Sequence, residues 1–240
     1  MTPALDILRN SWRIYRANGQ LIVGYAAWLL LTAAAFVLAS FIGNDVARGS
    51  VLFAVQIADL MLWFWVGIIV TRLTVAAVAD KKPDPISLTR DAWTLVFPLA
   101  WAGALQGLAT LGGLLLFIIP GFIFLVWFAY AQQAVVIEGK FGLEALAESR
   151  SLCRDRFFTA AWYLFVGPFL VMTVYIVVLS VIFALIAAAT HAPIETLFGD
   201  QPPLWMDMTA SLGEIFLMPL LYVYWALSYL ELKKTRIVAV

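Results

Sequence analysis

Long apolar runs, each of about 20 residues or more, recur from one end of the chain to the other. At 1.5 Å per residue, a helix of this length crosses the roughly 30 Å hydrocarbon core of a bilayer. Because 64% of the residues are hydrophobic and only 12% are charged, the composition is too apolar for a water-soluble domain. Apolar and polar residues do not alternate within the runs, so the pattern predicts membrane-spanning helices and not a β-barrel.

Six of these runs predict an all-α fold with six transmembrane helices in one membrane domain, residues 1–240. Polar stretches separate the runs, including Gly43-Asn44-Asp45 and Gly49-Ser50 before the second span, the proline-containing loop 80–85, and the loop 191–203. The predicted spans are residues 20–42, 51–79, 94–117, 121–137, 157–189 and 204–230.

Lysine and arginine are confined to alternate connections. All 15 of them except Arg48 and Arg72 lie before the first span, in the loops after the second and fourth spans, or after the sixth span. Under the positive-inside rule, this asymmetry places both termini in the cytoplasm. No cleavable signal peptide is expected, because the segment before the first apolar run is charged and no small-residue cleavage pattern follows it.

Short amphipathic segments lie on this cationic side. Residues 4–16 place Trp12 and Tyr15 on an apolar arc opposite the arginines, residues 141–153 have a polar stripe, and residues 86–93 form a weaker third case. The pattern predicts two or three helices that lie in the bilayer interface.

These segments also suggest an internal repeat. Residues 5–11 align without gaps on residues 143–149, and residues 86–95 fit the same frame more loosely, with Trp93 opposite Trp12. We therefore predict three copies of a surface helix followed by a hairpin, in units of approximately 4–79, 86–137 and 141–231. The alternative is that membrane proteins commonly carry such segments without being repeats.

Three motifs carry a resemblance to a known family: Ile119-Pro120-Gly121, Val135-Val136-Ile137-Glu138-Gly139 and Ala145-Leu146-Ala147-Glu148-Ser149. Over residues 86–156, the chain resembles the membrane domain found beside glycerophosphodiester phosphodiesterases and similar six-helix bacterial inner-membrane proteins. The resemblance implies a helical fold in a bacterial inner membrane. Catalysis in that family belongs to a separate soluble barrel, so no catalytic residue is carried over. We expect Pro120, Gly121, Glu138 and Gly139 to have structural roles.

Two carboxylates inside predicted spans are unexpected. Asp59 lies about 12 Å from the outer end of the second span, and Glu214 lies at a similar depth in the sixth. A charged residue inside a bilayer costs at least about 2.5–3.5 kcal/mol unless it is paired, protonated or hydrated. With Gln56 on the same face as Asp59, they form a candidate polar site for a proton or cation. The alternative is that each carboxylate is only hydrogen-bonded to neighbouring helices.

Other polar residues fit structural roles. We expect Arg72 to extend toward lipid phosphates, and Glu138 to accept hydrogen bonds from the following helix or to pair with Arg150. His191 and Glu195 are too few ligands for zinc, and Cys153 lacks a histidine partner. Nucleophile, metal and phosphate-loop motifs are missing from the sequence, so we expect no enzymatic activity, metal or cofactor.

The sequence therefore favours a non-enzymatic integral membrane protein, a lipid-associated scaffold or accessory module. Zero net charge gives no reason to expect nucleic-acid binding, whereas anionic lipids are the expected partners. A protein partner or a homo-oligomer remains open. The alternative function is a small transporter or channel that uses Asp59 and Glu214 in a cavity open to the outer side. The residues expected at the anionic-lipid interface are Arg9, Arg13, Arg16, Lys81, Lys82, Arg150, Arg154, Lys233 and Lys234.

Overall fold

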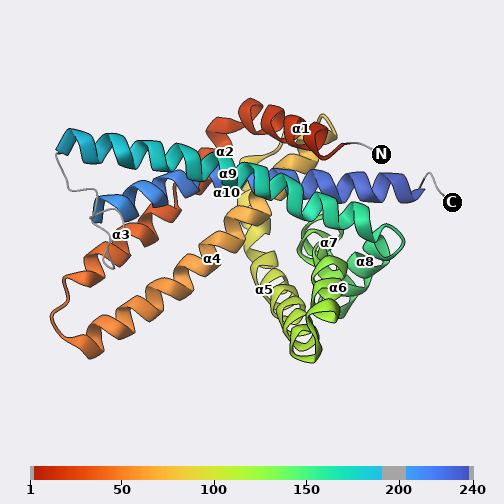
Figure 1. Cartoon of the computed structure of the whole chain (residues 1–240), viewed down its shortest axis with the longest axis horizontal. Helices are drawn as coiled ribbons and strands as arrows, with labels where there is room; N and C mark the ends of the chain where they lie inside the picture. Colours follow the sequence, from red (N-terminus) through yellow and green to blue (C-terminus); the bar gives the residue numbers. More distant parts are fainter. Residues whose placement is uncertain (1–2, 191–203, 238–240) are drawn as a thin grey trace.

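A computed structural model describes residues 3–190 and 204–237, and every regular element within these ranges is a helix (Figure 1). The predicted loop at 191–203, with His191 and Glu195, lies outside the described residues. In chain order the helices are α1 (Ala4–Ala17), α2 (Gly19–Ala26), α3 (Leu29–Ser40), α4 (Asp45–Val78), α5 (Pro85–Leu116), α6 (Ile118–Phe128), α7 (Ala131–Glu138), α8 (Leu143–Arg154), α9 (Phe157–Thr190) and α10 (Leu204–Ile237).

Within residues 3–190 and 204–237, six helical stretches are long and apolar enough to cross a membrane, which agrees with the predicted number of spans and indicates a multi-pass membrane protein. Helices α2 and α3 together make the first stretch, and α6 and α7 make the fourth. The six stretches are Gly19–Ser40, Asp45–Val78, Pro85–Leu116, Ile118–Glu138, Phe157–Ala189 and Met208–Thr235.

The second span begins earlier than predicted. Asn44 caps α4 because its side chain accepts a hydrogen bond from the Ala47 amide at 3.0 Å. The helix therefore starts at Asp45 and continues through Gly49 and Ser50, where a turn was predicted. A glycine-serine pair is tolerated inside a helix once a cap has fixed its start.

The segment 86–93 is not a separate surface helix, because it forms the first turns of the continuous helix α5. Asp84 caps this helix by accepting hydrogen bonds from the amides of Ile86 and Ser87, each at 3.2 Å. These backbone hydrogen bonds lower the pKa of the Asp84 carboxyl. Pro85 occupies the first helical position, where the absence of an N–H is harmless.

Two other helices differ from the predicted boundaries. The fourth span is interrupted between α6 and α7, where Ser149 of α8 accepts a hydrogen bond from the Tyr130 amide and donates one to the Trp127 carbonyl. The hydroxyl thus satisfies backbone groups that the interruption leaves free. The predicted basic tail after residue 230 is helical, since α10 continues to Ile237.

The buried core lies toward one end of the bundle, where α4, α7 and α10 pack together; we call it the hub. Its fully buried members include Val66, Ile69 and Leu73 of α4, Val135 of α7, and Tyr224 and Tyr229 of α10. Beyond the hub, the α3–α4, α5–α6 and α9–α10 pairs diverge as three arms (Figure 1). The side that holds α1, the loop 79–84, α8 and the last turns of α10 is called the basic side.

Two surface segments, the first turns of α5 and helix α8, pack on the hairpin that precedes them in the chain, whereas α1 packs on the last hairpin. Helix α8 contacts α6 and α7, and the first turns of α5 contact α2 and α4 through Thr89, which meets Tyr25 and Trp65. Helix α1 contacts α9 and α10, at the other end of the chain. The three contacts therefore form a closed cycle.

Candidate functional site

The residues predicted to face anionic lipid divide into two groups. Two of them are engaged within the protein: Lys233 donates to Glu138 at 2.5 Å, and the Arg150 guanidinium lies 4.7 Å from the centre of the Trp127 ring. The others are exposed and form no ion pair with any residue that the structure describes. This exposed group consists of Arg9, Arg13, Arg16, Lys81, Lys82, Arg154 and Lys234.

Four members of the exposed group converge on one cleft of about 920 Å³, which we call the basic cleft. It lies between α1, the turn that follows α4, and the end of α10. Its charged residues are the cations Arg13, Lys81, Lys82 and Lys234 and the acids Asp80 and Glu231. The cleft therefore has an excess of positive charge, supplied by three elements that are distant in the sequence.

Helix α1 presents one face to the bundle and another to the basic cleft. Ile7, Ser11 and Tyr15 are buried against the bundle, and burial raises the pKa of the Tyr15 hydroxyl. The neighbouring positions Asn10 and Arg13 consequently line the cleft. The i, i+4, i+8 spacing of these buried residues orients the helix and thus determines which polar residues face the cleft.

A tight turn at the end of α4 places the two cleft lysines. The Lys81 amide donates to the Ala76 carbonyl at 2.9 Å and the Asp80 amide donates to the Ala77 carbonyl at 3.3 Å, which is a Schellman motif. Asp80 has a φ of +52°, a left-handed conformation in which glycine is usual. The turn ends the helix abruptly and directs Lys81 and Lys82 toward α1.

Glu138 has different partners from those predicted. Its carboxylate accepts hydrogen bonds from the Tyr229 hydroxyl and from Lys233, both on α10. Arg150 is not its partner, since that side chain stacks on Trp127. The Glu138 contacts therefore join the end of α7 to α10.

The neighbouring motif residues have backbone roles. Gly139 ends α7 with a φ of +69°, in the left-handed region that favours glycine. Pro120 lies in the first turn of α6. An added Cβ on Gly121 would lie 2.4 Å from Leu114 side-chain atoms of α5, so this glycine permits close packing of the α5–α6 hairpin.

The two intramembrane carboxylates are brought together. Asp59 of α4 and Glu214 of α10 line the same cavity of about 120 Å³, which we call the acidic cavity. Thr32 of α3, which no sequence motif indicates as a site residue, donates a hydrogen bond to Asp59 at 2.5 Å. Gln56, the third residue of the predicted polar site, is exposed and does not line this cavity.

A wider apolar groove of about 750 Å³ continues from the acidic cavity and shares Phe36, Ser211 and Glu214 with it. The groove runs between α3 and α10. Glu214 therefore lies at the boundary between a small polar space and the lipid-facing surface.

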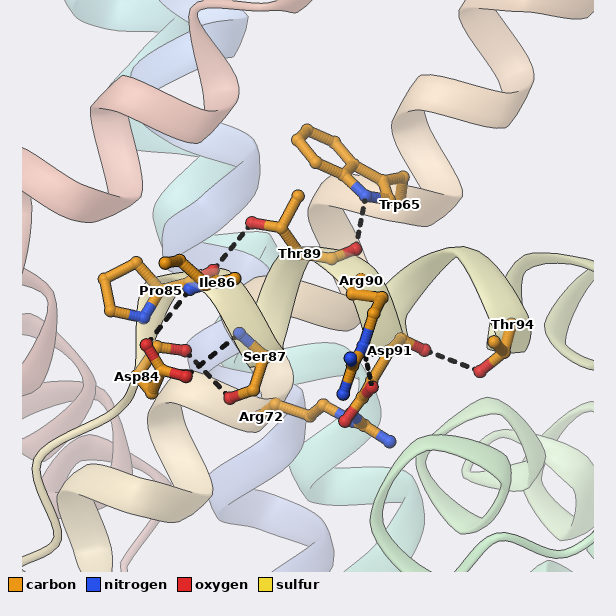
Figure 2. A network of polar contacts seen from close by, with 10 residues as sticks. All are labelled: Trp65, Arg72, Asp84, Pro85, Ile86, Ser87, Thr89, Arg90, Asp91 and Thr94. Carbon is orange, nitrogen blue, oxygen red and sulfur yellow. Dashed lines mark hydrogen bonds and ion pairs between the residues drawn. The ribbon is translucent and has the colours of Figure 1, made fainter.

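Arg72 has a protein partner. Its guanidinium lies 3.6 Å from the carboxylate of Asp91, which also lies 3.6 Å from Arg90 (Figure 2). The prediction that Arg72 extends to lipid phosphates is therefore not supported by its contacts. The pair joins α4 to the first turns of α5, beside the hydrogen bond from Trp65 to the Thr89 carbonyl.

Within the described residues, no group of three or more His, Cys, Asp or Glu side chains is placed to hold a metal ion. Cys153 is buried in α8, and this burial raises the pKa of its thiol to about 12. A thiol with such a pKa is a poor nucleophile at neutral pH.

Comparison with protein-family models, with curated proteins and with solved structures gives no match to this chain. The resemblance of residues 86–156 to a phosphodiesterase-associated membrane domain therefore stays a prediction from motifs.

Proposed function

We propose that this protein is a non-enzymatic accessory protein of a bacterial inner membrane that binds anionic phospholipids on its basic side, which faces the cytoplasm. The observation that carries the proposal is the set of exposed cations without acidic partners on this side. Each such lysine or arginine near an anionic surface contributes about 1 kcal/mol to binding. The resemblance of residues 86–156 implies the bacterial inner-membrane location and the helical fold.

Apolar side chains on the surface helices support the same placement. Leu5 and Trp12 of α1 are 62% and 53% exposed, and Leu143 of α8 is 72% exposed, although all three lie beside charged residues. Large exposed apolar residues next to cations are typical of helices that lie in the bilayer interface. Both α1 and α8 are therefore proposed to rest on the cytoplasmic leaflet.

The proposal is tested with purified protein and vesicles of defined composition. We expect stronger binding to lipids in phosphatidylglycerol or cardiolipin than in phosphatidylcholine, with a preference that weakens as salt rises, because surface charges are screened. Equal binding to all three lipids would count against it. Accessibility labelling of cysteines introduced near each terminus, in a Cys153→Ser background, tests the cytoplasmic orientation.

We also propose that the three units are repeats, with unit two beginning inside α5. The aligned residues of α1 and α8 support this, since Leu5 and Leu143 are exposed whereas Ser11 and Ser149 are buried. In the closed cycle of contacts, the first turns of α5 and helix α8 pack on the preceding hairpin and α1 packs on the last one, which is the arrangement that three equivalent units would produce. An experimental structure in lipid in which the three hairpins fail to superpose would contradict the repeat.

A second candidate function is favoured by the acidic cavity. Two carboxylates in one small cavity repel each other when both are charged, and a proton or cation held between them relieves that repulsion. A transporter or channel using Asp59 and Glu214 would show ion flux in proteoliposomes that Asp59→Asn abolishes. Absence of flux for protons and for monovalent cations, with normal insertion of the protein, would remove this candidate.

A further inference from the structure

We infer that the basic cleft is a binding site for the headgroup of one phospholipid with two negative charges, either a phosphomonoester or a pair of phosphodiesters. This inference rests on the proposed function and adds a defined site to it. A general attraction to anionic lipid needs only scattered surface charge, whereas a site requires that cations converge and have no other partner.

The convergence is a property of the fold. Arg13 comes from α1, Lys81 and Lys82 from the turn after α4, and Lys234 from the last turns of α10. None of these four forms an ion pair with a described residue, whereas Arg72, Lys233 and Arg48 each have an acidic partner within 4 Å. The cleft thus gathers cations that the protein itself leaves available to a ligand.

The acidic residues of the cleft limit its net charge. Asp80 and Glu231 lie among the four cations, so the lining carries an excess of two positive charges at neutral pH. A dianionic headgroup would neutralise this excess, and a singly charged one would neutralise half of it. We therefore expect dianionic lipids to bind more tightly than phosphatidylglycerol.

The apolar part of the lining indicates a lipid and not a free phosphate. Ile7 and Ile14 of α1, Val78 at the end of α4, and Leu227 and Leu230 of α10 line the same cleft. Val78 and Leu230 lie near the ends of the spanning stretches, at the depth where a headgroup joins its acyl chains. The asparagine amide of Asn10 adds a neutral hydrogen-bond donor to the lining.

Two triple variants with the same change in charge test the site. The cleft variant combines Arg13→Gln, Lys81→Gln and Lys82→Gln, and the control variant combines Arg9→Gln, Arg16→Gln and Arg154→Gln. All six wild-type side chains are exposed and free of ion pairs with described residues, so the two variants differ mainly in whether the lost cations line the cleft.

Native mass spectrometry of the detergent-solubilised protein with added cardiolipin or phosphatidic acid counts the lipids retained. We expect one retained lipid for wild type, a loss of affinity of at least about tenfold for the cleft variant, and a loss of less than about threefold for the control. Equal losses in both variants would overturn the site and leave the general lipid-binding proposal intact. If neither variant loses affinity, both proposals are wrong.

Two further experiments test the occupant of the cleft and the role of its charge. Inorganic phosphate and glycerol 3-phosphate compete with the lipid only weakly if acyl chains contribute to binding, and competition equal to that of a short-chain phosphatidic acid would overturn the lipid as occupant.

Asp80→Asn removes one acid from the lining and retains a residue that tolerates the left-handed conformation. Asp80→Asn is expected to raise lipid affinity severalfold. It therefore tests the site even if the triple variant does not fold. Unchanged or lower affinity would contradict the assignment of the basic cleft as a lipid site.

Discussion

Helix α4 passes through two environments. From Trp65 to Thr74 it lies in the hub, where Val66, Ile69 and Leu73 have no exposed surface. From about Val51 to Met61 it belongs to an arm, where Phe53 is 69% exposed and Leu60 is 52% exposed. The amino-acid composition of the two halves is similarly apolar, yet one half packs against protein and the other is left for lipid.

The two helices of the third hairpin show the same contrast. Helices α9 and α10 each contain 34 residues. In the most apolar stretch of α9, only 6% of the residues are buried, whereas in that of α10 the share is 56%. Lipid chains are as apolar as leucine, so burial against protein is not driven by escape from water in a bilayer. What distinguishes the hub is therefore close packing and hydrogen bonding, and these are the features that substitutions can test.

The largest expected difference concerns access to Cys153 of α8, which belongs to the same buried cluster as the hub residues. Cys153 is fully buried with a thiol pKa of about 12, whereas Ala147 of the same helix is exposed. At pH 8, a maleimide should modify Cys153 at least about 1,000-fold more slowly than a cysteine at position 147 in a Cys153→Ser background, because thiolate is the reacting species. Labelling rates before and after denaturation measure this. Equal rates in the native protein would mean that the buried face of α8 opens readily.

A matched pair of substitutions in α4 compares packing in the two halves. Ile69→Ala in the hub should lower the free energy of unfolding by about 2–5 kcal/mol, because it leaves a cavity among fixed neighbours. Ile57→Ala in the arm, at a side chain that is 45% exposed, should change it by less than about 1 kcal/mol. Thermal denaturation in detergent gives the difference, and equal effects would contradict the division into hub and arm.

Two glycines offer a smaller test with the opposite change in volume. A Cβ on Gly167 would lie 2.1 Å from the ring of Tyr224, whose hydroxyl donates to the Tyr163 carbonyl at 2.9 Å. Because that ring is fully buried, we expect Gly167→Ala to destabilise the protein by about 1–3 kcal/mol. Gly107 of α5 has open space at this position, so Gly107→Ala should be neutral or slightly stabilising. Chemical denaturation of both variants provides the measurement.

The division between hub and arms was not predictable from the apolar runs. Hydropathy located the six spans because each run is long enough to cross a bilayer. Counting residues paired Asp59 with Glu214 as carboxylates at similar depths, and both line the acidic cavity. Which side of each span packs on protein depends on partners from other hairpins. Tyr224, for example, fits against Gly167 of another helix, and nothing in either local sequence indicates that pairing.

For the two sites as well, the local sequence indicated some residues, but contacts between distant segments determined which of them meet. Charge asymmetry located the cations of the basic side, but the basic cleft forms only because α1 docks on α10, at the opposite end of the chain. Glu138 was expected to pair within its own region, and its partner Lys233 is 95 residues away. Asp84-Pro85 is a recognisable start signal for a helix, and α5 begins there and continues without a break through residues 86–93 into the third span.

The smallest expected effect lies in an arm, at Asp59. Replacement by Asn removes one of two like charges from the acidic cavity and retains an oxygen that accepts the Thr32 hydrogen bond. These changes should leave the free energy of unfolding within about 1 kcal/mol of wild type. Asp59→Leu also removes the acceptor of the Thr32 hydrogen bond, so it should lower the free energy of unfolding by more than Asp59→Asn does. Thermal denaturation of the two variants separates charge from hydrogen bonding. A loss of unfolding free energy for Asp59→Asn as large as that for Ile69→Ala would show that the carboxylate holds the α3–α4 and α9–α10 arms together. The acidic cavity would then contribute as much to stability as a buried position in the hub.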